Sequence, residues 1–285
     1  MDAINQPLLD VRDLSVAFGA TLAVDHVSFS VKRGECVALV GESGSGKSVS
    51  ALSILKLLPY PSASHPSGQI RFRGRDLLTA AESEMREIRG NDISIIFQEP
   101  MTSLNPLHTI EAQIGEILSL HSGIGGQTAR ARTLELLTQV GIPEPAERLN
   151  SFPHQMSGGQ CQRVMIAIAI ACNPKLLIAD EPTTALDVTI QKQILDLLMR
   201  LQTEHRMGLI MITHNMGVVA ETADRVIVQY KGRKMEEADV LSLFESPKSD
   251  YTRALLAALP DNATGDRLPT IGELFNPNNT VEGAA

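Results

Sequence analysis

The sequence of 285 residues predicts an α/β fold built around a parallel sheet. Three continuous apolar segments carry this prediction: "ECVALVG" at 35–41, "KLLIADE" at 175–181 and "GLIMITH" at 208–214. Runs without alternation are typical of parallel strands that are covered on both faces. The helix-like segment "TIQKQILDLLMRLQTE" at 189–204 connects the last two, as the crossover of a parallel pair requires.

The first part of the chain predicts a second, antiparallel sheet. Residues 8–33 alternate apolar and polar positions, which indicates strands with one face on a core. After the strand that ends at Gly41, "SVSALSILKLL" predicts a helix that continues up to Pro59. A hairpin-like segment at 67–77 and a short strand, "ISIIFQ", at 93–98 follow.

Between about residues 100 and 170 the pattern changes to helices. Ile110, Ile114, Ile117 and Leu118 share one helical face, and "TLELLTQV" at 133–140 repeats the periodicity. These features predict a helical insertion in an α/β domain that spans residues 1–260. Residues 261–285 are rich in Asn, Pro and Gly and are expected to form a tail or linker.

The composition excludes several classes of protein. A net charge of −8 argues against wrapping around nucleic acid, because such proteins usually carry a basic domain. Three cysteines without metal-ligand spacing argue against disulfides and zinc, and fit a reducing cytoplasm. The N-terminus lacks the apolar region of a signal peptide. The longest apolar run, at 164–172, is about half of a membrane span.

The segment "GESGSGKS" at 41–48 has the spacing of a phosphate-binding loop between a strand and a helix. Its glycines let successive N–H groups turn toward a phosphate, and the helix N-terminus adds positive potential. Lys47 would reach the β- and γ-phosphates, and Ser48 would ligate Mg²⁺. The loop residues expected to bind the nucleotide are Gly41, Ser43, Gly44, Ser45, Gly46, Lys47 and Ser48.

Two carboxylates, Asp180 and Glu181, follow an apolar strand at the edge of the sheet where ligands bind. Asp180 would orient Mg²⁺, directly or through water. Glu181 would polarise the attacking water, because phosphoryl transfer depends on positioning and electrostatics. The alternative is a pair of solvated carboxylates at a strand end.

A second candidate phosphate-reading turn lies in "MSGGQCQRVMIA" at 156–167. Ser157 would cap the following helix, while Gly158 and Gly159 would let its first N–H groups approach an anion. For an isolated motif, a cap without any ligand is the favoured alternative.

The order "GESGSGKS", Gln98, "MSGGQ", "LLIADE", "TALD" and His214 resembles the ATP-binding cassette (ABC) ATPase family over residues 8–260. The resemblance implies a P-loop NTPase cassette with a RecA-like core, an antiparallel β subdomain and an inserted helical subdomain. In that family two cassettes pair head to tail. The turn from Ser157 to Gln160 would therefore contact the nucleotide held by the partner's loop, and the resemblance implies ATP and Mg²⁺ as ligands.

The same resemblance assigns the remaining site residues. Phe18 stands where an aromatic ring stacks on adenine, with a buried core Phe as the alternative. Gln98 matches the Q-loop residue that touches Mg²⁺, and Asp187 matches the D-loop at the dimer interface. His214 matches the switch histidine that contacts the γ-phosphate. Catalysis would depend on Lys47, Glu181 and His214.

Two positions depart from the family pattern. Cys161 replaces a charged or polar residue after the signature, so we expect a weakened or redox-sensitive contact with the partner. Ala238 stands where glycine is usual, and predicts a local change in a turn.

The segments "FQEPMTSLNP", "FPHQMSGGQ" and "SPKSDYTRALLAALP" look like the di- and oligopeptide importer branch, which includes relatives for nickel, glutathione and peptide antibiotics. This resemblance implies a peripheral ATPase on the cytoplasmic face of a bacterial inner membrane. Its partners would be two integral membrane permeases, a second cassette and, indirectly, an extracytoplasmic substrate-binding protein. No cysteine follows Cys172, so we predict no iron–sulfur cluster. The tail leaves open a fused double ATPase of which this chain is the N-terminal half.

Three rival functions belong to other classes. A soluble ABC ATPase acting on nucleic acid or ribosomes would predict a basic patch, tandem cassettes or a coiled-coil insertion. A regulatory subunit without hydrolysis would lack Glu181 or His214. A simple P-loop kinase would leave the signature and "TALD" unexplained.

Overall fold

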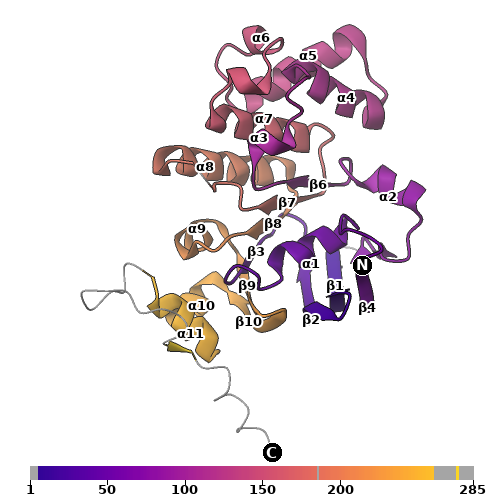
Figure 1. Cartoon of the computed structure of the whole chain (residues 1–285). Coiled ribbons are helices and arrows are strands. Elements are labelled where there is room, and N and C mark those ends of the chain that lie inside the picture. Colours follow the sequence, from indigo (N-terminus) through magenta and orange to yellow (C-terminus); the bar gives the residue numbers. More distant parts are fainter. Residues whose placement is uncertain (1–5, 185, 260–273, 276–285) are drawn as a thin grey trace, which may run out of the picture.

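The computed structural model describes residues 6–184, 186–259 and 274–275. At its centre is a six-stranded sheet in the order β10-β9-β3-β8-β7-β6, parallel except for β10 (Figure 1). Its strands are β3 (Cys36–Val40), β6 (Ile93–Ile96), β7 (Leu176–Asp180), β8 (Gly208–Ile212), β9 (Arg225–Tyr230) and β10 (Arg233–Asp239). The predicted buried parallel sheet is confirmed.

A four-stranded antiparallel sheet covers one flank of this core, as the alternation of residues 8–33 predicts. Its order is β2-β1-β4-β5. The strands are β1 (Leu9–Phe18), β2 (Thr21–Val31), β4 (Ala63–Phe72) and β5 (Arg75–Asp76). Helix α1 (Lys47–Ile54) shares one hydrophobic cluster with the inner faces of both sheets. The phosphate loop at its start is therefore fixed by packing on two sides.

Helix α1 is shorter than predicted and ends at Ile54 rather than near Pro59. The chain leaves the helix because Lys56 adopts a left-handed backbone with φ +50°. Its Nζ donates hydrogen bonds to the carbonyls of Leu78 and Ala80. These contacts bind the end of α1 to the segment before α2 (Glu82–Ile88), so the tertiary context overrides the helical periodicity.

Helices occupy the chain between β6 and β7 and form the upper layer of the molecule in Figure 1. They are α3 (Pro100–Ser103), α4 (Ile110–Ser122), α5 (Gly126–Gln139), α6 (Pro145–Arg148) and α7 (Gly158–Ile170). The predicted stripe Ile110, Ile114 and Leu118 is buried, with Ile117 partly buried against it. The same cluster includes Leu177 of β7, so this layer shares its core with the sheet.

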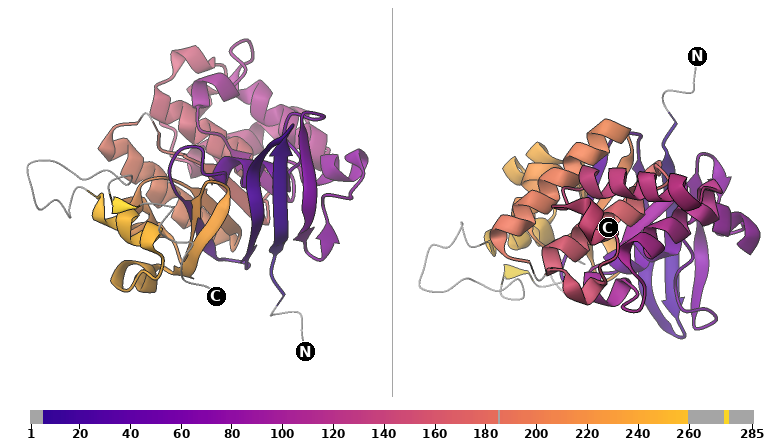
Figure 2. Two further views of the ribbon diagram at one scale, coloured as in Figure 1. Left: turned by 60° about the horizontal axis from the view of Figure 1, so that its bottom comes forward. Right: turned by 90° about the horizontal axis from the view of Figure 1, so that it is seen from above.

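The remaining helices follow β7: α8 (Val188–His205), α9 (Met216–Thr222), α10 (Val240–Glu245) and α11 (Asp250–Ala257). Helix α8 confirms the predicted crossover. Both views of Figure 2 put the yellow α10 and α11 on the flank away from the helical layer. There they pack with α9 and the outer face of β3 and β9. No helix in the described part of the chain combines the length and apolarity that a bilayer span needs.

Two of our expectations concern the C-terminal part of the chain, at Ala238 and at residues 261–285. Ala238 lies within strand β10 opposite Val226, so the expected change in a turn is wrong. Most of the expected tail, residues 261–273 and 276–285, lies outside the described residues.

Candidate active site

The phosphate loop joins the end of β3 to the start of α1, at the edge of the sheet where the parallel strands end. Gly41 and Gly46 have φ of +147° and +98°. A Cβ on Gly41 would lie 2.1 Å from the Gln229 carbonyl oxygen, and one on Gly46 would lie 2.7 Å from that of Ala23. Only glycine fits this conformation against the neighbouring backbone.

Lys47 is the first residue of α1 and only 6% of its surface is exposed. Its Nζ donates to the carbonyls of Gly41 at 2.7 Å and Glu42 at 2.8 Å. Burial lowers the pKa of Lys47, while Glu181, Asp180 and Glu42 act in the opposite direction. The ammonium group is thus folded onto its own loop, with acceptors that phosphate oxygens can replace.

Ser48 and Asp180 meet across the end of β7, and the Ser48 hydroxyl donates to Asp180 Oδ1 at 3.1 Å. Burial raises the pKa of Asp180, although this hydrogen bond acts against the rise. Two hard oxygen donors side by side fit Mg²⁺, which keeps several waters and takes the rest of its ligands from phosphates. Within the described residues no group of three or more His, Cys, Asp or Glu could hold a metal without such help.

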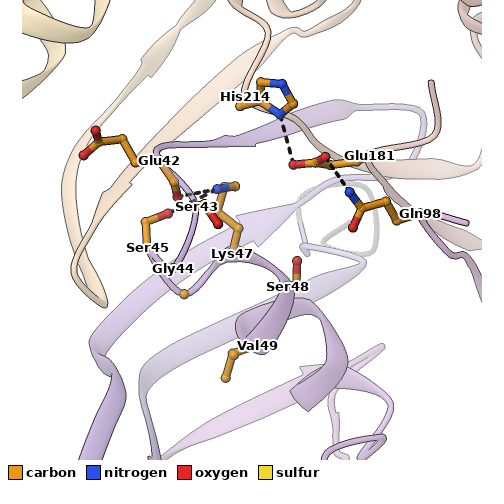
Figure 3. A pocket seen from close by; sticks show the side chains of 11 residues that line it. Glu42, Ser43, Gly44, Ser45, Lys47, Ser48, Val49, Gln98, Glu181 and His214 are labelled. Atoms are coloured by element: carbon orange, nitrogen blue, oxygen red, sulfur yellow. Dashed lines mark hydrogen bonds and ion pairs between the residues drawn. The ribbon is translucent and has the colours of Figure 1, made fainter. Parts of the chain in front are cut away.

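Glu181 follows Asp180 and lies at the centre of a hydrogen-bonded group (Figure 3). Its backbone is left-handed at φ +45°, with its N–H donated to the Ile212 carbonyl at 2.9 Å. His214 Nδ1 lies 3.0 Å from Oε1, and Gln98 Nε2 donates to Oε2 at 3.0 Å. A carboxylate oxygen can only accept in such a contact, so the pair suits a His214 ring that donates from Nδ1.

Thr184 is a further contact of Glu181 that our sequence analysis missed. Its hydroxyl donates to Glu181 Oε2 at 2.9 Å, three residues along the chain. The Glu-x-x-Thr spacing was the available signal, since a turn after a strand brings such residues together. Both carboxylate oxygens of Glu181 are therefore engaged.

A cavity of 610 Å³ brings most of the predicted phosphate-loop residues together with Gln98, Glu181 and His214. It is lined by Glu42, Ser43, Gly44, Ser45, Gly46, Lys47, Ser48, Val49, Gln98, Glu181 and His214. Gly41 and Asp180 do not line the cavity, but each accepts a hydrogen bond from a residue that does: Gly41 from Lys47, and Asp180 from Ser48. Glu42 and Val49 were not among the predicted residues. The arrangement can hold a polyphosphate against one buried cation and bring Glu181 to a water beside it.

Phe18 lies outside this lining. It ends β1 at the β1–β2 hairpin, opposite Thr21, and is partly buried against the hydrophobic cluster around α1. Its stacking on adenine stays a prediction.

The signature turn forms a separate group that does not line the cavity. Ser157 caps α7: its hydroxyl accepts from the Gln160 N–H at 3.3 Å, and Gln160 Oε1 accepts from the Ser157 N–H at 3.0 Å. A Cβ on Gly159 would lie 2.9 Å from Ile190 Cγ2, so the turn packs closely against the start of α8. Asp187 caps α8 by accepting from the Ile190 N–H at 3.0 Å.

Cys161, the residue after the signature turn, lies inside the helical layer. Its side chain is fully buried in the helical core, with Sγ 3.4 Å from the Pro153 carbonyl oxygen. Burial also raises the pKa of the thiol, which disfavours the reactive thiolate. The buried position counts against a redox-sensitive contact through the Cys161 thiol, and the expected weakening of the contact with a partner stays a prediction.

Comparison with known families gives a match to the model described as ABC transporter, over residues 24–184. The peptidoglycan transport ATP-binding protein YejF of Agrobacterium fabrum is 66% identical over 259 residues, covering 90% of this chain and 47% of that protein. The dipeptide transport ATP-binding protein DppD of Escherichia coli is 53% identical over 260 residues, covering 90% and 79%. The chain thus spans about half the length of the first of these relatives.

Solved structures show the same fold. The dimeric ATP-binding cassette MJ0796, in a post-hydrolysis state with ADP and phosphate, has a TM-score of 0.72 at 30% identity, covering 81% of this chain and 98% of that one. CbiO1 of Clostridium perfringens, part of an ABC transporter complex, has a TM-score of 0.72 at 27% identity, covering 85% and 92%.

Proposed function

This chain belongs to the ABC transporter family of ATP-binding proteins, and on that premise we propose that it hydrolyses ATP to drive the import of peptides or related small solutes. The observation that carries the proposal is the cavity at the strand ends, where a buried lysine, a serine–aspartate pair and a hydrogen-bonded glutamate converge. Phosphoryl transfer needs this combination of positioning and charge.

Nucleotide binding would use the backbone N–H groups from Ser43 to Ser48 around the β-phosphate. Lys47 would exchange the carbonyls of its own loop for phosphate oxygens. Phe18 would stack on adenine. Ser48, Asp180 and Gln98 would hold Mg²⁺, which supplies positive charge to the phosphates when it is bound.

Hydrolysis would use Glu181 to orient and polarise a water, with His214 on the γ-phosphate. In the structure Glu181 is engaged by Gln98, His214 and Thr184. We infer that a carboxylate oxygen becomes free for water when Gln98 or His214 turns toward the nucleotide. The resting contacts would thus limit hydrolysis until ATP is seated.

A complete site would need a second cassette, because Ser157, Gly158, Gly159 and Gln160 lie outside the cavity of their own chain. Head-to-tail pairing would bring this turn to the γ-phosphate held by the partner, with Asp187 at the interface. The partner would be a second copy, a homologous chain, or another half of a longer protein. The relative YejF supports the last of these, another half of a longer protein, because this chain covers only 47% of its length.

The transported solute would be a peptide or a related small solute; the names of the two relatives refer to peptidoglycan transport and dipeptide transport. The chain would bind two integral membrane permeases at the cytoplasmic face of a bacterial inner membrane. An extracytoplasmic binding protein would deliver the solute. Rotation of helices α3–α7 against the sheet would link dimer closure to the permeases. Neither relative supports the nucleic-acid or ribosome alternative.

The test is affinity capture of the tagged chain from detergent-solubilised native membranes, with mass spectrometric identification of its partners. We expect two polytopic permeases and a cassette partner, with ATP hydrolysis in the captured complex. The Lys47→Ala variant is the matched control and should recover the same partners without hydrolysis. Recovery of ribosomes or nucleic acid, or of no membrane protein, would contradict the importer function.

A further inference from the structure

We propose that the hydroxyl group of Tyr251 in α11 is a positioning group for the phosphate loop, through which the C-terminal segment sets the affinity of the loop for nucleotide. The inference rests on the proposed function of that loop in binding ATP. It concerns a residue that the sequence motifs of the site do not include.

Tyr251 contacts the loop directly from the back. Its hydroxyl oxygen accepts a hydrogen bond from the N–H of Glu42, the second residue of the loop, at 3.3 Å. The residues lie 209 positions apart in the chain, so the contact is purely tertiary. Tyr251 is fully buried, which leaves its hydroxyl without access to bulk water. Losing this acceptor would leave the Glu42 N–H to find another partner or stay unpaired.

A second contact clamps the other end of the loop. Gly232, in the turn between β9 and β10, donates its N–H to the Ser45 carbonyl at 3.0 Å. Tyr230, two residues earlier, packs its ring against Tyr251 with centroids 4.5 Å apart. The two clamps are therefore one packed unit, in which the orientation of Tyr251 depends on the β9–β10 turn.

Phe275 completes an aromatic cluster, by which we mean Tyr230, Tyr251 and Phe275. Its ring meets that of Tyr251 edge-on with centroids 5.3 Å apart, and it is buried. Such edge-to-face contacts favour one orientation of the rings beyond simple burial. The C-terminal segment thus reaches the loop through Phe275 and the Tyr251 hydroxyl.

The chemistry of Tyr251 suits a fixed acceptor. Burial raises its pKa to about 12, so the phenol remains neutral throughout the range in which ATP is handled. The phosphate loop binds anions through backbone N–H groups whose directions depend on how the loop is held. A loop held at Glu42 and Ser45 is ordered before nucleotide arrives, and pre-ordering favours binding.

The test compares Tyr251→Phe with Tyr230→Phe in the full chain by titration with fluorescent ATP and ADP analogues. Tyr251→Phe keeps the ring and removes only the acceptor, and should raise Kd for both nucleotides about three- to tenfold, the worth of one hydrogen bond. The kcat at saturating ATP should stay unchanged. Tyr230→Phe is the matched control, because its hydroxyl has no hydrogen bond within the described residues, and should bind like wild type.

Amide hydrogen exchange of the phosphate loop gives a second measurement without nucleotide. We expect faster exchange at Glu42 in Tyr251→Phe and no change in Tyr230→Phe. An unchanged Kd in Tyr251→Phe, even with a lower Tm, would mean that Tyr251 only packs. This result would overturn the inference about Tyr251 and leave the proposed function of the loop intact. Failure of the wild-type chain to bind any nucleotide would instead overturn the proposed function.

Discussion

The phosphate-loop cavity and the signature turn differ in how complete each is within one chain. Around the cavity, side chains from distant segments already touch: Ser48 meets Asp180, and Glu181 meets His214. In the signature turn, the side chains of Ser157 and Gln160 each accept from the other's backbone N–H, and Ser157 is exposed. The cavity holds charged groups that need a ligand, whereas the turn holds a neutral cap facing outward.

This difference indicates that nucleotide binding and hydrolysis make different demands on a single chain. The cavity has its lysine and Mg²⁺-binding oxygens in position, so we expect a single chain to bind nucleotide. The signature turn gains a ligand only if another cassette presents one, so we expect hydrolysis to depend on pairing. Substitutions in the two regions should therefore separate binding from turnover.

The largest effect is expected in the cavity. Glu181→Gln should lower kcat by about 10³-fold, because it removes the group that polarises the attacking water. Nucleotide binding should persist, since Lys47 and Ser48 are untouched, and ATP should accumulate in a closed dimer. Turnover and size-exclusion chromatography with ATP would measure both.

The control for this variant is Glu221→Gln, an exposed carboxylate on α9 that lies near Lys192. It should hydrolyse ATP like the wild-type protein. Wild-type turnover by Glu181→Gln would remove Glu181 from the water-positioning role.

The next effect separates the cap from the contact in trans. Ser157→Asp keeps a side chain that can cap α7 but adds a negative charge, which should lower turnover about 100-fold by repelling the partner's nucleotide. Ser157→Ala should lower turnover less, and stability by about 1 kcal/mol through the lost cap. Nucleotide affinity of the monomer should be unchanged in both. A fall in monomer affinity would show that the turn acts within its own chain.

Much of the fold could be predicted because local patterns and tertiary structure agree. The apolar runs at β3, β7 and β8 have no polar face to expose, so they had to become buried parallel strands. The strand–loop–helix order likewise fixed Lys47 and Ser48 at the start of α1. Carboxyl ends of parallel strands share one edge, which places Glu181 and His214, predicted separately, beside each other.

What the sequence could not provide depends on contacts between distant segments. Helix α1 ends early because the Lys56 side chain reaches carbonyls beyond the next hairpin. The burial of Cys161 depends on the angle at which α7 enters the helical core, which periodicity alone does not determine. The Tyr251–Glu42 bond joins segments that no local motif relates.

A smaller effect concerns stability and pH. Burial raises the pKa of Asp180, so the folded chain holds that proton more tightly than the unfolded chain. Stability therefore falls as pH rises from the ordinary carboxyl range through the raised pKa, and ionised Asp180 destabilises the nucleotide-free fold at neutral pH. Asp180→Asn should raise Tm at pH 7, by roughly 2–4 °C for each kcal/mol relieved. The gain should shrink as pH falls through about 4 and vanish below about pH 3, where Asp180 is protonated in both states.

Thermal unfolding across pH, with and without MgATP, measures both the cost of the buried Asp180 charge and the stability gained from the ligand. Wild type should gain stability from MgATP, and Asp180→Asn should gain much less. Asp239→Asn is the matched control, because a hydrogen bond with Ser242 lowers the pKa of that exposed carboxylate. Its substitution should not raise Tm. A lower Tm in Asp180→Asn would mean that its bond with Ser48 outweighs the cost of burial.

The smallest effect is expected beside the signature turn itself. Cys161 follows Gln160 in sequence, but its side chain faces the helical core while Ser157 faces outward. Cys161→Ala should therefore change turnover less than about twofold, since no nucleotide contact is lost, and lower stability by roughly 1 kcal/mol through the small cavity it leaves. ATPase assays after treatment with a thiol oxidant should give the same activity for wild type and variant. A selective loss of wild-type activity would mean that α7 opens during turnover and exposes the thiol.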